Sequence, residues 1–150
     1  MTTFRHSIPF VQQLAPIIRQ CWEMGWHESN AGNVSWRVPG EEVAAMLSGL
    51  AGRPGDPVAL PQPHPSLDGD HFILSGSGEF FRQATERPNE VFGIVRIVEG
   101  GTAYQQLWGF EGGASPTSEF ATHLVAHAIR KRVSGGREHV VCHCHPPELI

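Results

Sequence analysis

The chain has 150 residues, a formal net charge of −4 with neutral histidines, and a charged fraction of 17%. This length suits one domain with a substantial core, and 40% hydrophobic residues exclude a disordered polyelectrolyte. The acidic balance and the lack of long Lys or Arg runs argue against nucleic acid or an anionic membrane as a partner. The sequence shows neither an apolar run long enough for a transmembrane helix nor a secretory signal.

The cysteines and histidines give the first functional indication. Three cysteines are an odd number, and two of them alternate with histidines in the pattern Cys-His-Cys-His at 142–145. This pattern does not indicate a disulfide framework, and we therefore expect a protein of the reducing cytoplasm. Nine histidines are many for this length, so their positions carry information.

The first half of the chain predicts a helix, a strand and a second helix. Apolar residues at helical spacing predict a helix over 8–24 that Pro16 kinks or restarts. Alternating residues predict a strand over 34–38, followed by a short helix over 41–50. Residues 51–70 are rich in Pro, Gly and Asp, and we expect a long surface loop there.

The second half predicts several strands. A short strand over 71–74 runs into a turn of Ser and Gly, and residues 91–98 and 102–108 predict a hairpin. The last strand is expected over 139–145, where Pro-Pro ends it.

One long helix separates the hairpin from the last strand. Ser115 as the cap and Pro116 at the first helical position predict that it begins there and continues to about Val133. The order of helix, strands, helix and strand predicts an α/β fold, α+β in detail, with helices packed on a sheet. Since no closing element follows the last strand, we expect the single domain over 1–150 to be truncated at its C-terminus.

The strongest local signal is the pair His143 and His145. Residues i and i+2 of a strand project to the same face, so these imidazoles are neighbours while Cys142 and Cys144 point the other way. Two neutral imidazoles on one face can share a divalent ion, by default Zn²⁺. The alternative is a histidine pair that is merely partly exposed.

The predicted start of the long helix offers a second signal. Hydroxyls of Thr117 and Ser118, together with free backbone N–H groups, can make an anion site without a basic residue. Taken alone, however, this signal favours ordinary helix capping. Glu119, His123 and His127 follow at i, i+4 and i+8 and could form a metal face. We favour packing or surface roles for His123 and His127, since a metal bound there would leave the pair at 143 and 145 without a function.

Two turns add further donors. The segments 75–78 (SGSG) and 30–33 (NAGN) combine glycines, which allow close backbone approach, with hydroxyl and carboxamide groups. Each alone is also typical of an ordinary turn, and the first lacks the lysine of a P-loop. Three donor-rich loops, one carboxylate and a histidine pair together predict metal-assisted chemistry on a small phosphorylated substrate.

Five segments in this order resemble the class II aldolase/adducin superfamily. They are GWHESNAGNVSWRV, ILSGSGEFFR, GIVRIVEGGTAYQQLWG, PTSE and HVVCHCH, and the resemblance runs from about Phe10 to the end. The elements SGSG-x-FF and Y-x-x-LWG favour the branch that acts on L-rhamnulose 1-phosphate over the fuculose aldolases and pentulose-phosphate epimerases.

The resemblance implies a mainly antiparallel central sheet flanked by helices, in a cytoplasmic homotetramer with sites at subunit interfaces. It implies zinc-dependent, reversible cleavage of L-rhamnulose 1-phosphate into dihydroxyacetone phosphate and L-lactaldehyde, a reaction of rhamnose catabolism, with one Zn²⁺ per subunit. By the same resemblance, Glu119 moves the proton, and His143 and His145 are two zinc ligands. The loops that hold the substrate phosphate match Asn30, Gly32, Asn33, Ser77, Gly78, Thr117 and Ser118.

The resemblance also leaves alternatives open. The family's third zinc-binding histidine lies in a C-terminal portion that this chain does not have, so we expect the isolated chain to be inactive or nearly so. The other hypotheses are a sister sugar-phosphate aldolase or epimerase, and a non-catalytic adducin-like or metal-binding remnant. The one lysine, Lys131, lies among arginines on a helix turn that looks exposed, which argues against a Schiff-base aldolase.

Overall fold

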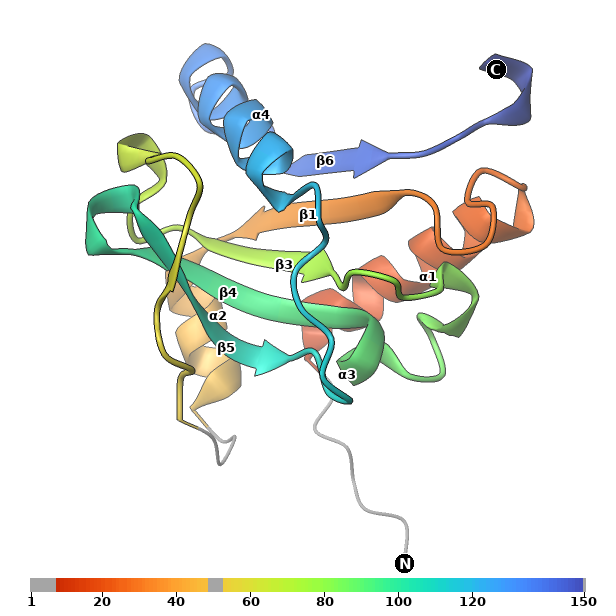
Figure 1. Cartoon of the computed structure of the whole chain (residues 1–150), viewed down its shortest axis with the longest axis horizontal. Helices are drawn as coiled ribbons and strands as arrows, with labels where there is room; N and C mark the ends of the chain where they lie inside the picture. The colour runs from red at the N-terminus through yellow and green to blue at the C-terminus, as the bar shows by residue number, and fades with distance from the viewer. Residues whose placement is uncertain (1–7, 49–52, 150) are drawn as a thin grey trace, which may run out of the picture.

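A six-stranded, antiparallel sheet forms the centre of the molecule in a computed structural model that describes residues 8–48 and 53–149 (Figure 1). The strand order is β2-β5-β4-β3-β1-β6, and every pair of neighbours is antiparallel. This confirms the expected fold class. The strands are β1 Asn33–Val38, β2 Val58–Ala59, β3 His71–Ser75, β4 Phe92–Val98, β5 Ala103–Gly109 and β6 Val140–His143.

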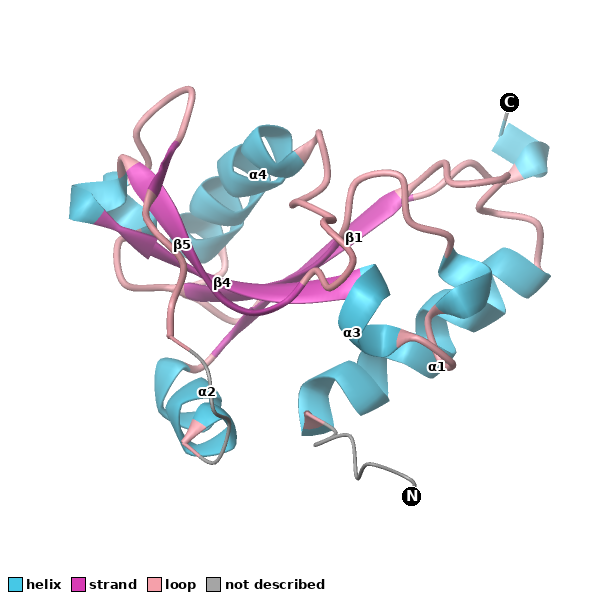
Figure 2. Ribbon diagram, turned by 60° about the horizontal axis from the view of Figure 1, so that its bottom comes forward, coloured by secondary structure: helices cyan, strands magenta, loops and turns pink. Residues whose placement is uncertain are grey.

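Helices cover both faces of the sheet. Figure 2 shows α1, α2 and α3 on one face and α4 on the other. Because each face is covered, both sets of alternating strand residues are buried, and the molecule has two apolar layers. The helices are α1 Pro9–Glu23, α2 Gly40–Leu47, α3 Pro88–Val91 and α4 Phe120–Val133.

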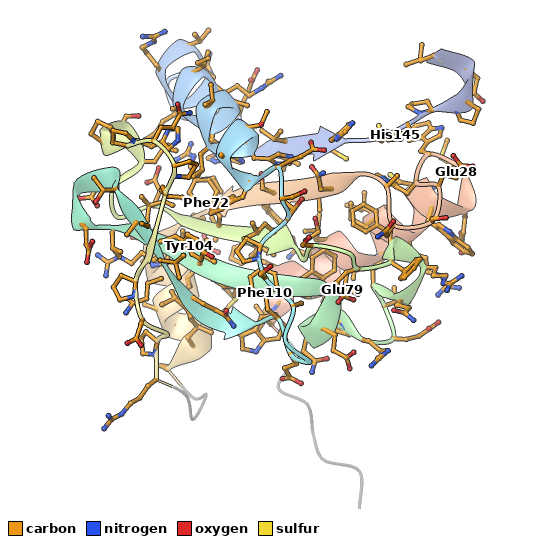
Figure 3. The ribbon with its side chains drawn as sticks, in the orientation of Figure 1. Glu28, Phe72, Glu79, Tyr104, Phe110 and His145 are labelled. Carbon is orange, nitrogen blue, oxygen red and sulfur yellow. The ribbon has the colours of Figure 1, made fainter. Side chains whose placement is uncertain are left out.

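Strand β3 contributes side chains to both apolar layers. Ile73 packs in the layer beneath α1, whereas Phe72 and Leu74 pack in the layer beneath α4. In that second layer the ring of Phe120 meets Phe72 and Tyr104 edge-on, with centroids 6.3 and 5.6 Å apart (Figure 3). The start of α4 is therefore fixed on the sheet by aromatic contacts.

An ion-pair cluster fixes the other end of α4. The ammonium of Lys131 donates to Asp70 at 2.8 Å, and Arg37 lies 3.8 Å from the same carboxylate. Arg37 also donates to the carbonyl of Gly136 at 3.0 Å. Lys131 thus has a structural partner, which agrees with the argument against a Schiff-base lysine.

The long helix begins later than the sequence predicted. It starts at Phe120 rather than at Ser115 and Pro116, and Glu119 precedes it without a side-chain capping bond. The reason is non-local: Pro116 forms a β-bridge with Gly76, which holds the segment extended. Ser115 could not act as the cap because its carbonyl accepts from Ser77 at 2.8 Å.

Other boundaries also differ from the predictions. The expected loop over 51–70 contains β2 and a short 3₁₀ turn at Pro65–Leu67 in its described part, since β2 pairs with β5. Helix α2 ends at Leu47, and the end predicted at residue 50 lies outside the described residues. The last strand ends at His143 rather than 145. Among the residues that the structure describes, no helix has the length and apolarity to cross a membrane.

We expect Leu124→Ala to lower the free energy of unfolding by about 2–5 kcal/mol, because Leu124 is fully buried beneath α4 and its loss leaves a cavity. The matched control on the same helix is Val133→Ala, whose parent side chain is 76% exposed and which should change stability by no more than about 0.5 kcal/mol. Denaturant unfolding measures both, and equal effects would contradict the packing described.

Candidate active site

A cleft of about 330 Å³ lies where the start of α4 meets the end of β6. Four segments form it: the turns at 30–33 and 76–78, the segment 117–119, and the residues that end and follow β6. Every site residue predicted from the sequence lines this one cleft, although their roles remain predictions. The lining residues are Asn30, Ala31, Gly32, Asn33, Gly76, Ser77, Gly78, Thr117, Ser118, Glu119, His143 and His145.

Strand register brings these distant segments together. In the pairing of β1 with β6, Asn33 lies opposite His143, so the turn before β1 borders the histidine pair. The Gly76–Pro116 bridge likewise places the SGSG turn beside the segment that leads into α4, and Thr117 donates to the carbonyl of Ser75 at 3.0 Å. Backbone hydrogen bonds rather than flexible side chains therefore set the spacing of the cleft walls.

A buried histidine supports the NAGN turn from behind. Nδ1 of His27 donates to the carbonyl oxygen of Ala31 at 3.1 Å, and its ring stands edge-on to Phe81 at 4.3 Å. Gly32 has a φ of +86°, and a Cβ there would lie 2.0 Å from that Nδ1 and 2.8 Å from the carbonyl oxygen of His143. Only glycine fits this position. This role of His27 could not be predicted, since nothing in the neighbouring sequence indicates the contact.

Glu119 determines which nitrogen of His143 carries the proton. Nδ1 of His143 lies 2.8 Å from Oε2 of Glu119, so Nδ1–H donates to the carboxylate and Nε2 of the neutral ring keeps its lone pair. That Nε2 lies 3.1 Å from Nε2 of His145. The backbone N–H of His145 donates to the carbonyl of Trp26 at 2.7 Å, which fixes this residue after β6 has ended.

The histidine pair fits two positions of a zinc site. Two nitrogens bound to one tetrahedral Zn²⁺ lie about 3.3 Å apart, close to the observed separation of the two Nε2 atoms. Cys142 and Cys144 do not line the cleft, as the strand alternation predicted. Within 8–48 and 53–149, no group of three or more His, Cys, Asp or Glu residues is arranged to hold a metal. By themselves the two histidines would supply only part of a coordination shell, with Glu119 hydrogen-bonded to the far nitrogen of His143.

The rest of the cleft suits an anion without a basic residue. No Lys or Arg is among its lining residues, which instead offer hydroxyls, carboxamides and backbone N–H groups. The N-terminal end of α4 follows directly, and its dipole favours negative charge. Glu79 does not line the cleft, because its side chain lies over Gly76 near Phe110, where burial raises its pKa (Figure 3).

The two histidines of α4 are buried beneath the helix, as the packing interpretation predicted. His123 and His127 are 2% and 1% exposed, and both contact the hydroxyl of Ser35. Burial lowers the pKa of His123 and lowers that of His127 to about 3. Both rings are therefore neutral at physiological pH. Because Ser35 lies far away in the sequence, this contact could not be predicted from local pattern.

The fold and the cleft define a class of protein that comparison confirms. Residues 12–150 match the family model described as the Class II Aldolase and Adducin N-terminal domain, and the chain belongs to this family. It is 38% identical over 141 residues to rhamnulose-1-phosphate aldolases of Yersinia pestis (strain Pestoides F) and Yersinia pseudotuberculosis serotype O:1b (strain IP 31758). These matches cover 94% of this chain and 51% of each relative, so the chain spans about half of their length.

A solved structure agrees with the fold. The crystal structure of a sugar-phosphate aldolase from Thermotoga maritima matches with a TM-score of 0.67 at 23% identity, covering 94% of this chain and 55% of that one. At this identity the match shows the shared fold alone.

Acid should destabilise the protein through its buried histidines. Burial lowers the pKa values of His27, His123 and His127, so below about pH 6.5 the unfolded chain binds more protons than the folded one. The free energy of unfolding should therefore fall as the pH falls below about 6.5, by up to ~1.4 kcal/mol per pH unit for each such histidine. Denaturant unfolding between pH 7 and 4.5 measures this slope.

The variant His127→Gln should make that slope shallower because it removes one buried titrating ring. The same substitution at His139, a partly exposed residue at the start of the last strand segment, serves as the control. An equal change of slope in both variants would show that burial of His127 is not the cause.

Proposed function

We propose that the protein catalyses the reversible aldol cleavage of L-rhamnulose 1-phosphate to dihydroxyacetone phosphate and L-lactaldehyde, with one Zn²⁺ per subunit. One observation carries the proposal: two imidazole Nε2 atoms converge at 3.1 Å in a cleft that also holds a carboxylate and three donor-rich turns. The relatives from the two Yersinia species are rhamnulose-1-phosphate aldolases, which supports this choice of substrate. We further propose that the protein is a cytoplasmic homotetramer that serves rhamnose catabolism.

The turns bind the phosphate end of the substrate. Hydroxyls of Ser77 and Ser118 are exposed at the cleft, and the carboxamides of Asn30 and Asn33 border it. These neutral donors, with the N-terminal end of α4, stabilise a phosphate dianion without requiring a lysine or arginine. Gly32, Gly78 and Thr117 complete the proposed set of phosphate-binding residues.

The histidine pair would hold the metal ion. His143 and His145 present their Nε2 atoms to it, and the remaining ligands come from outside the described residues or from solvent. When bound, the ion supplies a Lewis acid that stabilises negative charge developing on the ketone side of the substrate. By accepting the hydrogen bond of Nδ1–H, Glu119 selects the neutral tautomer of His143 whose lone pair lies on Nε2, the atom that would bind the metal.

Glu119 also moves the proton of the reaction. Cleavage takes a proton from the hydroxyl of the carbon that becomes the aldehyde and adds one to the carbon that becomes a hydroxymethyl group. A single carboxylate can do both in turn. Only Oε2 of Glu119 bonds His143, and the carboxylate lines the cleft with its side chain 41% exposed, so Oε1 is available for this exchange.

Two other functions remain distinct hypotheses. A sister sugar-phosphate aldolase or an epimerase would use the same phosphate turns and metal and differ at the aldehyde end of the substrate. A non-catalytic adducin-like or metal-binding protein would have no use for Glu119 combined with two metal-ligating histidines. The presence of all three in one cleft favours catalysis.

The test is a substrate panel with the full-length protein, rather than this isolated chain, supplied with Zn²⁺. We expect dihydroxyacetone phosphate to be released from L-rhamnulose 1-phosphate with a higher kcat/KM than turnover of L-fuculose or L-ribulose phosphates. A preference for another phosphate would establish the sister enzyme. Bound zinc without turnover of any substrate would favour the non-catalytic hypothesis.

The variant Glu119→Gln should lower kcat by a factor of about 100 or more with little change in KM, since it removes the proton carrier but keeps the size of the side chain. The control is Glu138→Gln, because Glu138 is exposed and pairs with Arg130 at the far end of α4. Near-normal turnover by Glu119→Gln would remove Glu119 from the mechanism.

A further inference from the structure

A buried chain of hydrogen bonds leads away from the cleft beneath α4. Nε2 of His123 lies 2.5 Å from Oδ1 of Asn33, and Nδ1 of the same ring lies 2.7 Å from Oγ of Ser35. That hydroxyl lies 2.8 Å from Nε2 of His127. All four residues are at least nine-tenths buried, and only Asn33 reaches the cleft. The chain ends at Nδ1 of His127, which is buried without a partner.

Because the hydroxyl of Ser35 has the two rings as its partners and donates to one of them, the chain can run in two directions, with each neutral imidazole donating at one nitrogen and accepting at the other. In the first direction, His127 donates from Nε2 to Ser35, Ser35 donates to Nδ1 of His123, and Nε2 of His123 donates to Oδ1 of Asn33. In the second, every bond is reversed and Asn33 donates from its NH₂ group. The direction decides which end of the amide faces the cleft.

The unpartnered nitrogen at the end of the chain selects the first direction. In that direction, Nδ1 of His127 is an acceptor with an unused lone pair; in the second it is a buried N–H with nothing to accept it. A buried N–H without a partner is rarer in folded proteins than an unused acceptor. The structure agrees, since it places Oδ1 rather than Nδ2 of Asn33 against His123.

We propose that Ser35, His123 and His127 are positioning residues that hold the carboxamide of Asn33 with its NH₂ group toward the cleft, where it donates to an anionic oxygen. The identity of that anion as the substrate phosphate rests on the proposed function; the orientation of the amide does not. A reversed amide would present its carbonyl oxygen and repel a phosphate. The two buried histidines therefore act on binding although neither lines the cleft.

The positioning role of Ser35 and His127 requires both rings to be neutral, because an imidazolium at His123 would donate from both nitrogens and orient the amide of Asn33 without them. Burial lowers the pKa of His123 and that of His127, as described above, which keeps both rings neutral. The ring of Phe72 packs against His127 with centroids 4.9 Å apart and contributes an apolar neighbour to its surroundings. These surroundings offer no acceptor to Nδ1 of His127 among the described residues.

Nitrogen-15 NMR of the histidine rings tests the direction in the unmodified protein. We expect both His123 and His127 to carry their proton on Nε2 and to have an unprotonated Nδ1. A proton on Nδ1 of either ring, alone or in an imidazolium, would overturn the proposal. Titration with inorganic phosphate should in addition shift the side-chain NH₂ signals of Asn33, and saturable phosphate binding that leaves them unmoved would equally contradict it. Neither measurement requires aldolase turnover.

Kinetics of Ser35→Ala test the consequence for binding. Without the hydroxyl, the amide of Asn33 loses its fixed orientation, and we expect KM for the phosphorylated substrate to rise about tenfold while kcat changes less than about threefold. Ser35→Thr keeps the hydroxyl, and its KM should stay close to that of the unmodified protein. The control is Ser134→Ala, which removes an equally bonded serine at the far end of α4.

The kinetic and spectroscopic results separate two kinds of failure. An unchanged KM in folded Ser35→Ala, or an equal rise of KM in Ser134→Ala, would overturn the positioning role. If the protein turns over no sugar phosphate at all, the proposed function fails, but the tautomers and the Asn33 signals still decide the orientation. Should Ser35→Ala fail to fold, the measurements on the unmodified protein decide the proposal alone.

Discussion

The antiparallel pairing of β1 with β6 is the constraint on which the site depends. It sets Asn33 opposite His143, and so brings the turn before β1 against the histidine pair at the end of β6. A slip of one residue would reverse the faces of β6 and turn Cys142 toward the cleft in place of His143. Gly32 tightens the same junction, because no side chain fits between His27 and the backbone of His143.

The same strand ties the cleft to the core. Asn33 and Ser35 lie on the face of β1 that α4 covers, while Val34 between them packs in the layer beneath α1. A polar network thus shares the α4 layer with apolar residues such as Leu124. Because the groups of this network are neutral and nearly all hydrogen-bonded, the network avoids the free-energy cost of burying a charge. The position of α4 on the sheet sets the geometry of the network.

Local pattern predicted the parts of the site that depend on local geometry. Strand alternation predicted that His143 and His145 lie together and Cys142 apart from them, although β6 itself ends at His143 and a hydrogen bond to Trp26 fixes His145. The start of α4 was predicted wrongly because the cap signals at Ser115 are overridden by the bridge to Gly76, about forty residues earlier in the chain. The roles of His27 and Ser35 arise from contacts that no local pattern encodes, so only the structure reveals them.

The X-ray absorption spectrum at the zinc edge of the zinc-loaded protein tests the central claim most directly. If His143 and His145 face the cleft as the structure shows, the spectrum will show coordination by nitrogen and oxygen only, with the scattering pattern of imidazole rings. Sulfur in the coordination shell would mean that a cysteine binds the metal, and Cys142 and Cys144 are the cysteines next to the histidine pair. That result would contradict the claim that the histidines rather than the cysteines face the cleft, and with it the candidate active site described above.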